Sequence, residues 1–277
     1  MSTVTITAAD VNKLRTQTGA GMMDCKKALM ESDGDFEKAV DYLRKKGQKV
    51  AANRGDRDAK EGQVIAAVTP DGKRGAIICL NCETDFVAIN ADFAGFAQSI
   101  LDAAISQNPA SLDALKALEL NGETIENKII DYVGKIGEKI ELSRYEVVNA
   151  ERVISYIHPG NKLATLIGFN KVDVDAQIGK DVAMQAAAMA PVALDKDDVD
   201  ASTLEREIEI GKEQARAEGK PEEMLEKIAQ GKLQKFYKES TLLNQEFIKD
   251  NKMNVAQYIK SADKDLVATG FKRVQLG

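Results

Sequence analysis

Cysteine and histidine supply the few candidates for covalent, metal or acid–base chemistry in this sequence. Cys79 and Cys82 form a CxxC pair near the end of a predicted strand. Redox-active CxxC pairs normally lie at a helix N-terminus, where the thiol pKa is lowered. Residues three apart on a strand point to opposite faces, and no second CxxC completes a zinc site. We therefore predict packing cysteines and disfavour the alternative of a thiol oxidoreductase.

The single histidine and the glycine–lysine dipeptides limit the remaining chemistry. His158 is the only histidine, so His-rich metal sites and HExxH chemistry are excluded. It precedes Pro-Gly in a predicted turn and no GxSxG motif is present, so we interpret it as a surface or partner-contact residue. None of six Gly-Lys dipeptides is followed by Ser or Thr, which excludes a P-loop. The sequence predicts no catalytic residue, no metal site, no cofactor and no direct nucleotide binding, and hence no enzyme.

Residues 14–29 (LRTQTGAGMMDCKKAL) contain two adjacent methionines. Consecutive helical residues point about 100° apart, so Met22 and Met23 cannot both face the centre of a small helical bundle. The thioether is flexible and polarisable, which is typical of adaptable protein-binding surfaces. Two interpretations stay open: exposure of at least one methionine to a partner, or two methionines that fill the edges of the bundle core.

Residues 81–87 (NCETDFV) follow a predicted strand and precede a predicted helix, a junction that often presents side chains outward. In the simpler interpretation, Thr84 or Asp85 caps the helix while Phe86 and Val87 anchor the turn to the core. In the functional alternative, a carboxylate beside an aromatic ring is held rigidly so that it can part a polar, ion-containing site on a partner.

Composition restricts the class of protein. The 277 residues suggest about two structural units. There are 38 Lys and Arg against 44 Asp and Glu, a net charge of −6 that argues against a dedicated nucleic-acid binder. No apolar run approaches the ~20 residues that span a bilayer. The start, MSTVTITAADVNKL, predicts no secretory signal, and three cysteines cannot form a disulfide framework. We expect a cytoplasmic protein that binds neither membranes nor nucleic acids.

Residues 1–48 are predicted to form an N-terminal module of three helices. Thr7 and Asp10 provide a capping-box-like start. The third predicted helix carries four apolar residues at the spacing of one buried face: Phe36, Ala39, Val40 and Leu43. We expect this helix to end at Gly47. Residues 49–61 are polar and lack periodicity, which favours a solvated linker over an RNA contact.

Beyond the linker, the sequence predicts an α+β core that is built twice. An order of strand, tight turn, strand and helix first occurs at 62–69, 74–81 and 91–105. A similar order returns at 153–157, 162–169 and 175–190. This suspected duplication predicts two subdomains with small antiparallel sheets, residues 62–145 and 146–277.

The second subdomain contains an unusually charged insertion at about 202–243. Ser202 and Glu205 resemble a capping box, narrow apolar seams follow, and Gly219-Lys220-Pro221 interrupts them. These features predict an inserted antiparallel helical hairpin. Two further elements are expected after it, a short helix and a closing strand: 255–259 and 267–276.

The stretches LRTQTGAGMMDCKKAL and NCETDFVAIN closely resemble the bacterial elongation factor Ts family, the guanine-nucleotide exchange factors of elongation factor Tu. The similarity includes KIGEKI (135–140) and GKPEEMLEKIAQGKLQKF (219–236), and so covers nearly the whole chain. The resemblance implies that the N-terminal module is a ubiquitin-associated-like bundle. It also implies a translation factor that binds elongation factor Tu with GDP, displaces Mg²⁺, and promotes release of GDP and exchange for GTP.

The resemblance implies three groups of partner-binding residues. Those of the N-terminal module would contact a helix of the GTPase domain: Arg15, Met22, Met23 and Lys26. Those associated with dislodging Mg²⁺ form one continuous segment: Thr84, Asp85, Phe86 and Val87. Those of the core would contact the partner: Ile136 and His158. The resemblance also implies that domains of the partner other than its GTPase domain are bound.

Two departures from the family pattern stand out. Some members carry another helix after the closing strand, and we expect no contact from such a helix in a chain that ends at Gly277. Ile89 occupies a position where a polar residue is common. The sequence leaves open whether the chain forms a homodimer. The alternative function is a non-catalytic adaptor whose helical module and hairpin bind partners without driving exchange.

Overall fold

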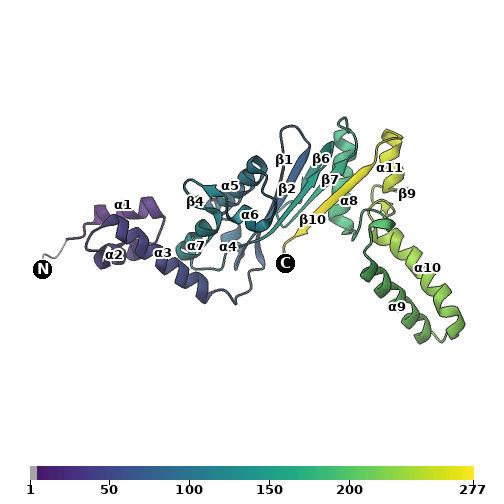
Figure 1. Cartoon of the computed structure of the whole chain (residues 1–277), viewed down its shortest axis with the longest axis horizontal. Helices are drawn as coiled ribbons and strands as arrows, with labels where there is room; N and C mark the ends of the chain where they lie inside the picture. The colour runs from purple at the N-terminus through teal and green to yellow at the C-terminus, as the bar shows by residue number, and fades with distance from the viewer. Residues whose placement is uncertain (1–4) are drawn as a thin grey trace. The chain divides into compact units, whose positions relative to one another are not determined.

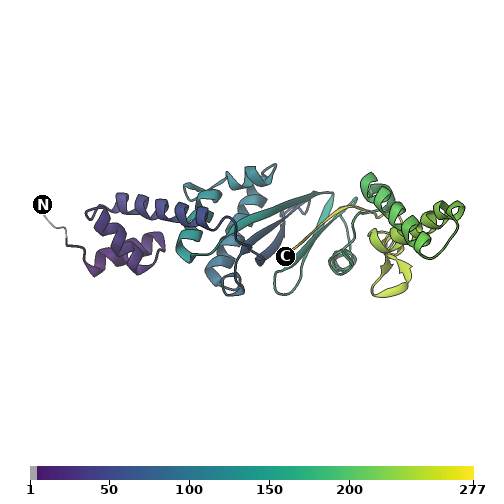
Figure 2. The same ribbon diagram turned by 90° about the horizontal axis from the view of Figure 1, so that it is seen from below.

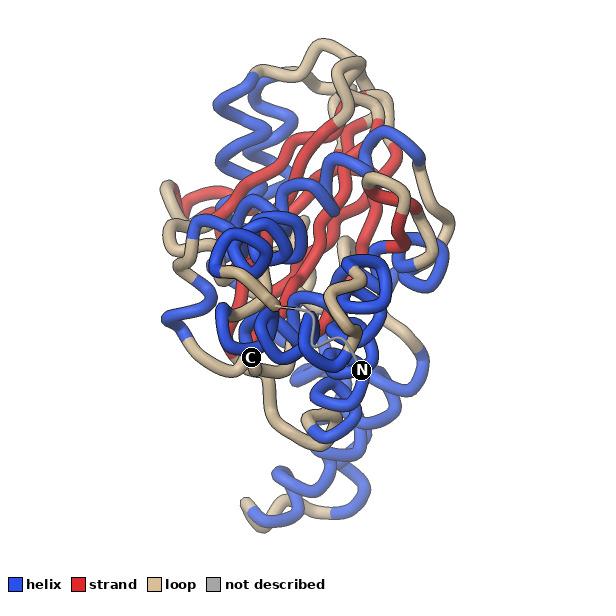
Figure 3. The backbone as a smooth tube through the Cα atoms, turned by 90° about the vertical axis from the view of Figure 1, so that its left-hand side faces the viewer, coloured by secondary structure: helices blue, strands red, loops and turns tan. Residues whose placement is uncertain are grey.

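The computed structural model describes residues 5–277. Residues 1–4, which belong to the N-terminal stretch that predicts no secretory signal, lie outside the described residues. The chain divides into two compact units. The first comprises Met1–Val64, Ile78–Tyr145 and Leu276–Gly277, and the second comprises Ile65–Ile77 and Glu146–Gln275. The predicted α+β class is confirmed, because the chain combines helices with small antiparallel sheets (Figure 3).

The first unit begins with three helices: α1 (Ala8–Thr18), α2 (Met22–Glu31) and α3 (Phe36–Asn53). The predicted capping box of α1 is confirmed. The N–H of Thr7 donates to Asp10 Oδ2 at 3.0 Å, and the N–H of Asp10 donates to Thr7 Oγ1 at 3.2 Å. Gly19 ends the helix in the left-handed conformation with a φ of 68°. The three helices share a small apolar core: Val11, Leu14, Cys25, Ala28, Leu29 and Ala39.

The prediction that Gly47 ends the third helix is wrong, because α3 continues to Asn53 and includes the first residues of the predicted linker. Gly47 is buried and packs against Gly134 of helix α7 (Ile125–Ile136). A Cβ placed on Gly134 would lie 2.8 Å from the Cα of Gly47, which is closer than real Cβ contacts allow. The glycine at position 47 therefore permits close helix packing and does not act as a helix stop.

The predicted hairpin is confirmed as strands β1 (Glu61–Val68) and β2 (Arg74–Cys82), which are neighbours in one sheet. The predicted helix at 91–105 is confirmed as α5 (Ala91–Gln107). Helix α7 was not predicted. Five further elements between positions 85 and 149 were also not predicted: α4 (Asp85–Ala88), α6 (Leu112–Lys116), β3 (Glu119–Leu120), β4 (Glu123–Thr124) and β5 (Glu141–Asn149). Strand β5 pairs with β2 and completes the order β1-β2-β5.

The second three-stranded sheet has the order β10-β7-β6, and its neighbouring strands are antiparallel. Its strands confirm the predicted ones: β6 (Arg152–Ile157), β7 (Leu163–Phe169) and β10 (Ala268–Gln275). The predicted helix that follows β7 is α8 (Ala176–Met189), and the predicted short helix that precedes β10 is α11 (Val255–Ala262). Phe169, Val182 and Ile259 are fully or almost fully buried in the apolar core that these elements share. A short helical turn, η1 (Lys196–Asp198), and two short paired strands complete the unit: β8 (Glu246–Phe247) and β9 (Asp250–Asn254).

Helices α9 (Ala201–Ala217) and α10 (Glu222–Ser240) pack against one another, as Figures 1 and 2 show. A Cβ on Gly211 of α9 would lie 3.2 Å from the Cα of Ala229 of α10. The predicted capping box of Ser202 and Glu205 is wrong. Asp200 caps α9 by accepting the N–H of Thr203 at 2.8 Å, and the Ser202 hydroxyl donates to the same carboxylate at 2.5 Å. An ionised carboxylate accepts both donors, and its charge is favourable at a helix N-terminus.

Candidate functional site

Residues 84–87 form a short, outward-facing segment in the first unit. Thr84 precedes α4 with extended backbone, and Asp85 is the first residue of this single helical turn. Asp85 is exposed, and the Phe86 side chain is 79% exposed. The interpretation in which Phe86 anchors the turn to the core is therefore wrong, although Val87 is half-buried. An acidic and an aromatic residue, consecutive in the chain, are therefore both exposed at the surface.

The end of α4 is tied to the core through its backbone. Ala88 is buried, and its carbonyl accepts a hydrogen bond from Gln63 Nε2 at 2.8 Å. Gln63 lies on β1 and is itself buried. The buried amide thus fixes the end of the short helix while the ring of Phe86 remains outside.

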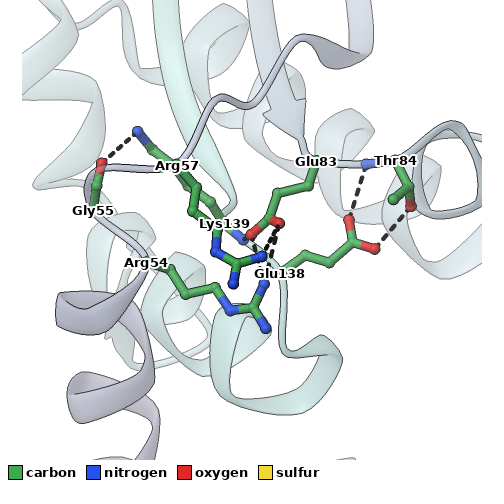
Figure 4. A network of polar contacts seen from close by, with 7 residues as sticks. All are labelled: Arg54, Gly55, Arg57, Glu83, Thr84, Glu138 and Lys139. Carbon is green, nitrogen blue, oxygen red and sulfur yellow. Dashed lines mark hydrogen bonds and ion pairs between the residues drawn. The ribbon is translucent and has the colours of Figure 1, made fainter.

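The beginning of α4 is held by Glu138, which lies just after α7. The backbone N–H of Thr84 donates to Glu138 Oε2 at 3.0 Å, and the Thr84 hydroxyl donates to Glu138 Oε1 at 2.8 Å (Figure 4). The Thr84 side chain makes no capping bond to α4. The prediction that Thr84 or Asp85 caps the helix through its side chain is therefore wrong for Thr84, whose hydroxyl bonds a distant carboxylate.

Glu83 directly follows β2 and accepts hydrogen bonds from three residues (Figure 4). Arg54 Nη1 lies 2.9 and 3.1 Å from its two oxygens, and Arg57 Nη1 lies 3.2 Å from Oε2. The backbone N–H of Lys139 donates to Oε1 at 2.6 Å. The Glu83 side chain is only 13% exposed. This carboxylate therefore connects the residues after α3, the end of β2 and the residues after α7.

The contacts of Glu83 also set its ionisation. Burial acts to raise the pKa of the Glu83 carboxyl, but the hydrogen bonds from Lys139, Arg54 and Arg57 outweigh it. The pKa of Glu83 consequently lies below its ordinary value. The group remains ionised at neutral pH and keeps all of its bonds.

The N-terminal group lies on α1 and α2. Arg15 and Lys26 are exposed, and Met22 and Met23 are 60% and 73% exposed. The interpretation in which both methionines fill the edges of the bundle core is wrong. Helix α2 begins at Met22, so both methionines occupy its first turn. Met30, seven residues beyond Met23 on the same helix, is also exposed, and the sequence analysis missed it although its helical spacing could have indicated it.

The two core residues lie in different units. Ile136 is the last residue of α7 in the first unit and is half-buried. His158 follows β6 in the second unit and is exposed. The Tyr156 hydroxyl lies 3.0 Å from His158 Nδ1, which orients the imidazole.

The prediction of packing cysteines is confirmed, because Cys25, Cys79 and Cys82 are all buried and free. Burial raises the pKa of the Cys79 thiol, and it raises the pKa of Cys82 to about 12. The Cys82 thiol donates to the Thr84 carbonyl at 3.1 Å. Thiolate chemistry is therefore disfavoured at this pair.

Two features of residues 5–277 bear on other classes of site. In that range, no three His, Cys, Asp or Glu side chains are grouped so that they could hold a metal ion. None of the helices there combines the length and apolar character that crossing a membrane requires. Two exposed features remain as candidate sites. One is the segment 84–87, which lies beside Glu83 and Glu138, and the other is the set of exposed methionines of α2.

Comparison with known proteins identifies the family of the chain. Residues 83–277 match the family described as elongation factor TS. Elongation factor Ts of Flavobacterium psychrophilum is 56% identical over 274 residues, which cover 99% of each chain. That of Cytophaga hutchinsonii is 55% identical over 275 residues, 98% of this chain and 99% of the relative. That of Porphyromonas gingivalis is 52% identical over 272 residues, 98% of each chain. The protein is thus a translation elongation factor that serves protein biosynthesis. The chain belongs to the elongation factor Ts family.

Proposed function

We propose that this protein is a guanine-nucleotide exchange factor for elongation factor Tu. It binds the GTPase with GDP, displaces Mg²⁺, and promotes release of GDP and its exchange for GTP. The observation that carries the proposal is the exposure of Asp85 and Phe86 on a segment whose backbone is held at both ends. A large exposed aromatic ring on a constrained backbone is typical of a protein-binding surface.

The two side chains have complementary roles in this proposal. Mg²⁺ is bound through oxygen ligands in strict geometry, so a carboxylate that approaches it disturbs its coordination. Asp85 supplies that carboxylate. The ring of Phe86 displaces the part of the partner that holds the metal, because burying an exposed aromatic side chain is favourable.

Exchange of this kind requires no bond chemistry from the protein, which we propose is not an enzyme and needs no cofactor. An exchange protein that prefers the nucleotide-free GTPase weakens the binding of the nucleotide. By linkage, the nucleotide weakens the binding of the exchange protein to the same extent. A coupling of ~4 kcal/mol corresponds to about a thousandfold change in affinity. Incoming GTP completes the exchange, because its binding in turn weakens the binding of the exchange factor and releases it.

Other surfaces secure the complex in this proposal. Helices α1–α3 act as a ubiquitin-associated-like bundle that contacts a helix of the GTPase domain, and four exposed side chains carry the contact: Arg15, Met22, Met23 and Lys26. Ile136 and His158 contact the partner from the core. Helices α9 and α10 form the antiparallel helical hairpin, whose paired faces are supported by the ion pair of Lys212 and Glu226 at 2.6 Å.

The rate of GDP release tests the proposal. Elongation factor Tu loaded with fluorescent GDP is mixed with excess unlabelled GDP in a stopped-flow instrument, with and without substoichiometric protein. We expect faster release with the wild-type chain and a much smaller effect with D85A/F86A. The matched control is V172A, which shortens another exposed apolar side chain and should release GDP at the wild-type rate. Release by D85A/F86A at the wild-type rate would refute the roles of Asp85 and Phe86.

The adaptor function is the second candidate, and the exposed methionines of α2 favour it because they suit binding alone. An adaptor would form a complex with the GTPase but leave the GDP off-rate unchanged. The same stopped-flow trace, recorded alongside a binding measurement, distinguishes the two functions.

A further inference from the structure

Helix α4 cannot hold the orientation of Asp85 and Phe86 by itself. It contains four residues and lacks a side-chain cap. Forming a single helical turn is unfavourable in isolation, because several dihedral angles are fixed for few hydrogen bonds. The orientation of its exposed side chains must therefore come from tertiary contacts.

Glu138 supplies the contact that sets the start of this helix. Its two carboxylate oxygens accept the N–H and the hydroxyl of the same residue, Thr84. Two bonds to one residue fix both the position of its backbone and the rotation of its side chain. Hydrogen bonds to an ionised acceptor are stronger than those between neutral groups. Thr84 is thereby held immediately before Asp85.

Glu83 supplies a second contact, one residue earlier in the chain. It joins Arg54, at the C-terminal end of α3, to the backbone of Lys139, which follows Glu138. The Lys139 ammonium in turn donates to the Gly55 carbonyl at 2.9 Å. Figure 4 shows the two glutamates side by side, with the arginines on one side and Thr84 on the other. Residues 54–57, 83–84 and 138–139 therefore form one polar network, which we term the glutamate brace.

We propose that Glu83 and Glu138 are positioning residues that hold Asp85 and Phe86 in the orientation required for nucleotide exchange, and that Arg54 and Arg57 extend this brace to the end of α3. The inference rests on the proposed function, because it assigns these residues a role in that same reaction. Neither glutamate needs to touch the partner, since Glu138 bonds Thr84 directly and Glu83, the preceding residue, is itself held by Arg54 and Lys139.

The first test uses E138Q and E83Q. Glutamine keeps the size of the side chain but has one acceptor oxygen, and its amide group faces donors that it cannot satisfy. We expect the maximal rate of GDP release to fall roughly tenfold, a smaller loss than the ~100-fold that a misplacement of about 1 Å can cause. The half-saturating concentration of the factor should change little. The control is E151Q, which breaks the exposed ion pair between Lys73 and Glu151 (3.1 Å) and should leave the rate unchanged.

A double-variant comparison separates positioning from a general structural role. If the glutamates act through Asp85 and Phe86, adding E138Q to D85A/F86A should slow release no further. If E138Q slowed GDP release in D85A/F86A by the same factor as in the wild-type chain, the proposal would be overturned. Wild-type release rates for both E83Q and E138Q would also overturn it. If E83Q unfolds, R54Q removes one arm of the brace and leaves the carboxylate with its other donors.

Hydrogen exchange of the free protein tests the brace without the GTPase. Amide exchange of residues 84–90, followed by mass spectrometry, should quicken at least about tenfold in E138Q and E83Q and stay unchanged in E151Q. Failure of the wild-type chain to speed GDP release would refute the proposed function and leave this measurement valid. Unchanged exchange in both glutamate variants would refute the brace itself.

Discussion

Gly47 of α3 and Gly134 of α7 face each other so closely that neither position has room for a methyl group without movement. A Cβ on Gly134 would lie 2.8 Å from the Gly47 Cα, and a Cβ on Gly47 would lie 3.3 Å from the Ile130 carbonyl oxygen. Both obstacles are backbone atoms, which cannot rotate away as a side chain can. The third helix of the N-terminal module therefore packs on α7 through backbone contact.

We predict that G134A destabilises the protein by about 1–2 kcal/mol. Overpacking a close contact costs about 1–3 kcal/mol, while alanine in place of glycine gains up to ~1 kcal/mol of helix propensity. The control is G95A in α5, where a Cβ meets nothing within 4 Å, and it should stabilise the protein by about 0.5–1 kcal/mol. Thermal unfolding followed by circular dichroism measures both, and equal stabilisation by the two variants would contradict the close contact.

A buried carboxylate in the second unit should make stability depend on pH. Asp181 accepts hydrogen bonds from Lys249 at 2.6 Å, Tyr258 at 2.7 Å and Gln177 at 2.7 Å. Burial acts to raise its pKa, but these bonds outweigh it and hold the pKa of Asp181 below 3.8. Because the pKa of Asp181 is lower in the folded state than in the unfolded state, its ionised carboxylate stabilises the fold. This contribution to the free energy of unfolding is complete at pH values above the unfolded-state pKa. It is lost as the pH falls from about 4 through the folded-state pKa.

We therefore expect the melting temperature of the wild-type chain to fall below pH 4 more steeply than that of D181N. At pH 7, D181N should be less stable by about 1–3 kcal/mol, because it loses charge-assisted bonds. Calorimetric scans at pH 7, 4 and 3 provide the measurement. Parallel pH profiles for the two proteins would show that Asp181 does not contribute to the acid transition.

Sequence reasoning succeeded where the signal lay within a few residues. The capping box of Thr7 and Asp10 lies within four consecutive residues, and the hairpin of β1 and β2 follows from two short apolar runs on either side of a Pro-Asp-Gly turn. It failed where the partner is distant in the chain. A glycine such as Gly47 is typical of the end of a helix. Only its contact with Gly134 shows that it permits close packing of α3 on α7.

The candidate site shows the same division. The exposure of Phe86 was one of two interpretations, and the sequence could not decide between them because each fits a strand-to-helix junction. The hydroxyl of Thr84 has the spacing of a cap, yet it bonds a glutamate 54 residues later. The roles of Arg54, Glu83 and Glu138 were not predicted, since nothing local indicates that three separate chain segments meet there.

The cysteines should be unreactive in the folded protein. Burial raises the pKa of Cys25 and Cys79, and raises that of Cys82 to about 12. Since the thiolate is the reactive form, Ellman's reagent at pH 8 should modify almost none of the three thiols in the native state. All three should react in guanidinium chloride. Rapid modification of Cys82 in the native state would mean that the residues around Thr84 open readily.

The methionines of α2 should contribute to binding the partner and little to folding. We expect M22A/M23A to weaken the complex with nucleotide-free elongation factor Tu by roughly tenfold, which corresponds to about 1.4 kcal/mol. Both side chains are mostly exposed, so the melting temperature should stay close to that of the wild type. Isothermal titration calorimetry measures the affinity, with M189A as the control because Met189 is exposed on α8 in the second unit. Equal loss of affinity in M189A, or unchanged affinity in M22A/M23A, would exclude a specific contact by the first turn of α2. Loss of affinity together with a full GDP-release rate at saturation would assign binding to the methionines and exchange to Asp85 and Phe86.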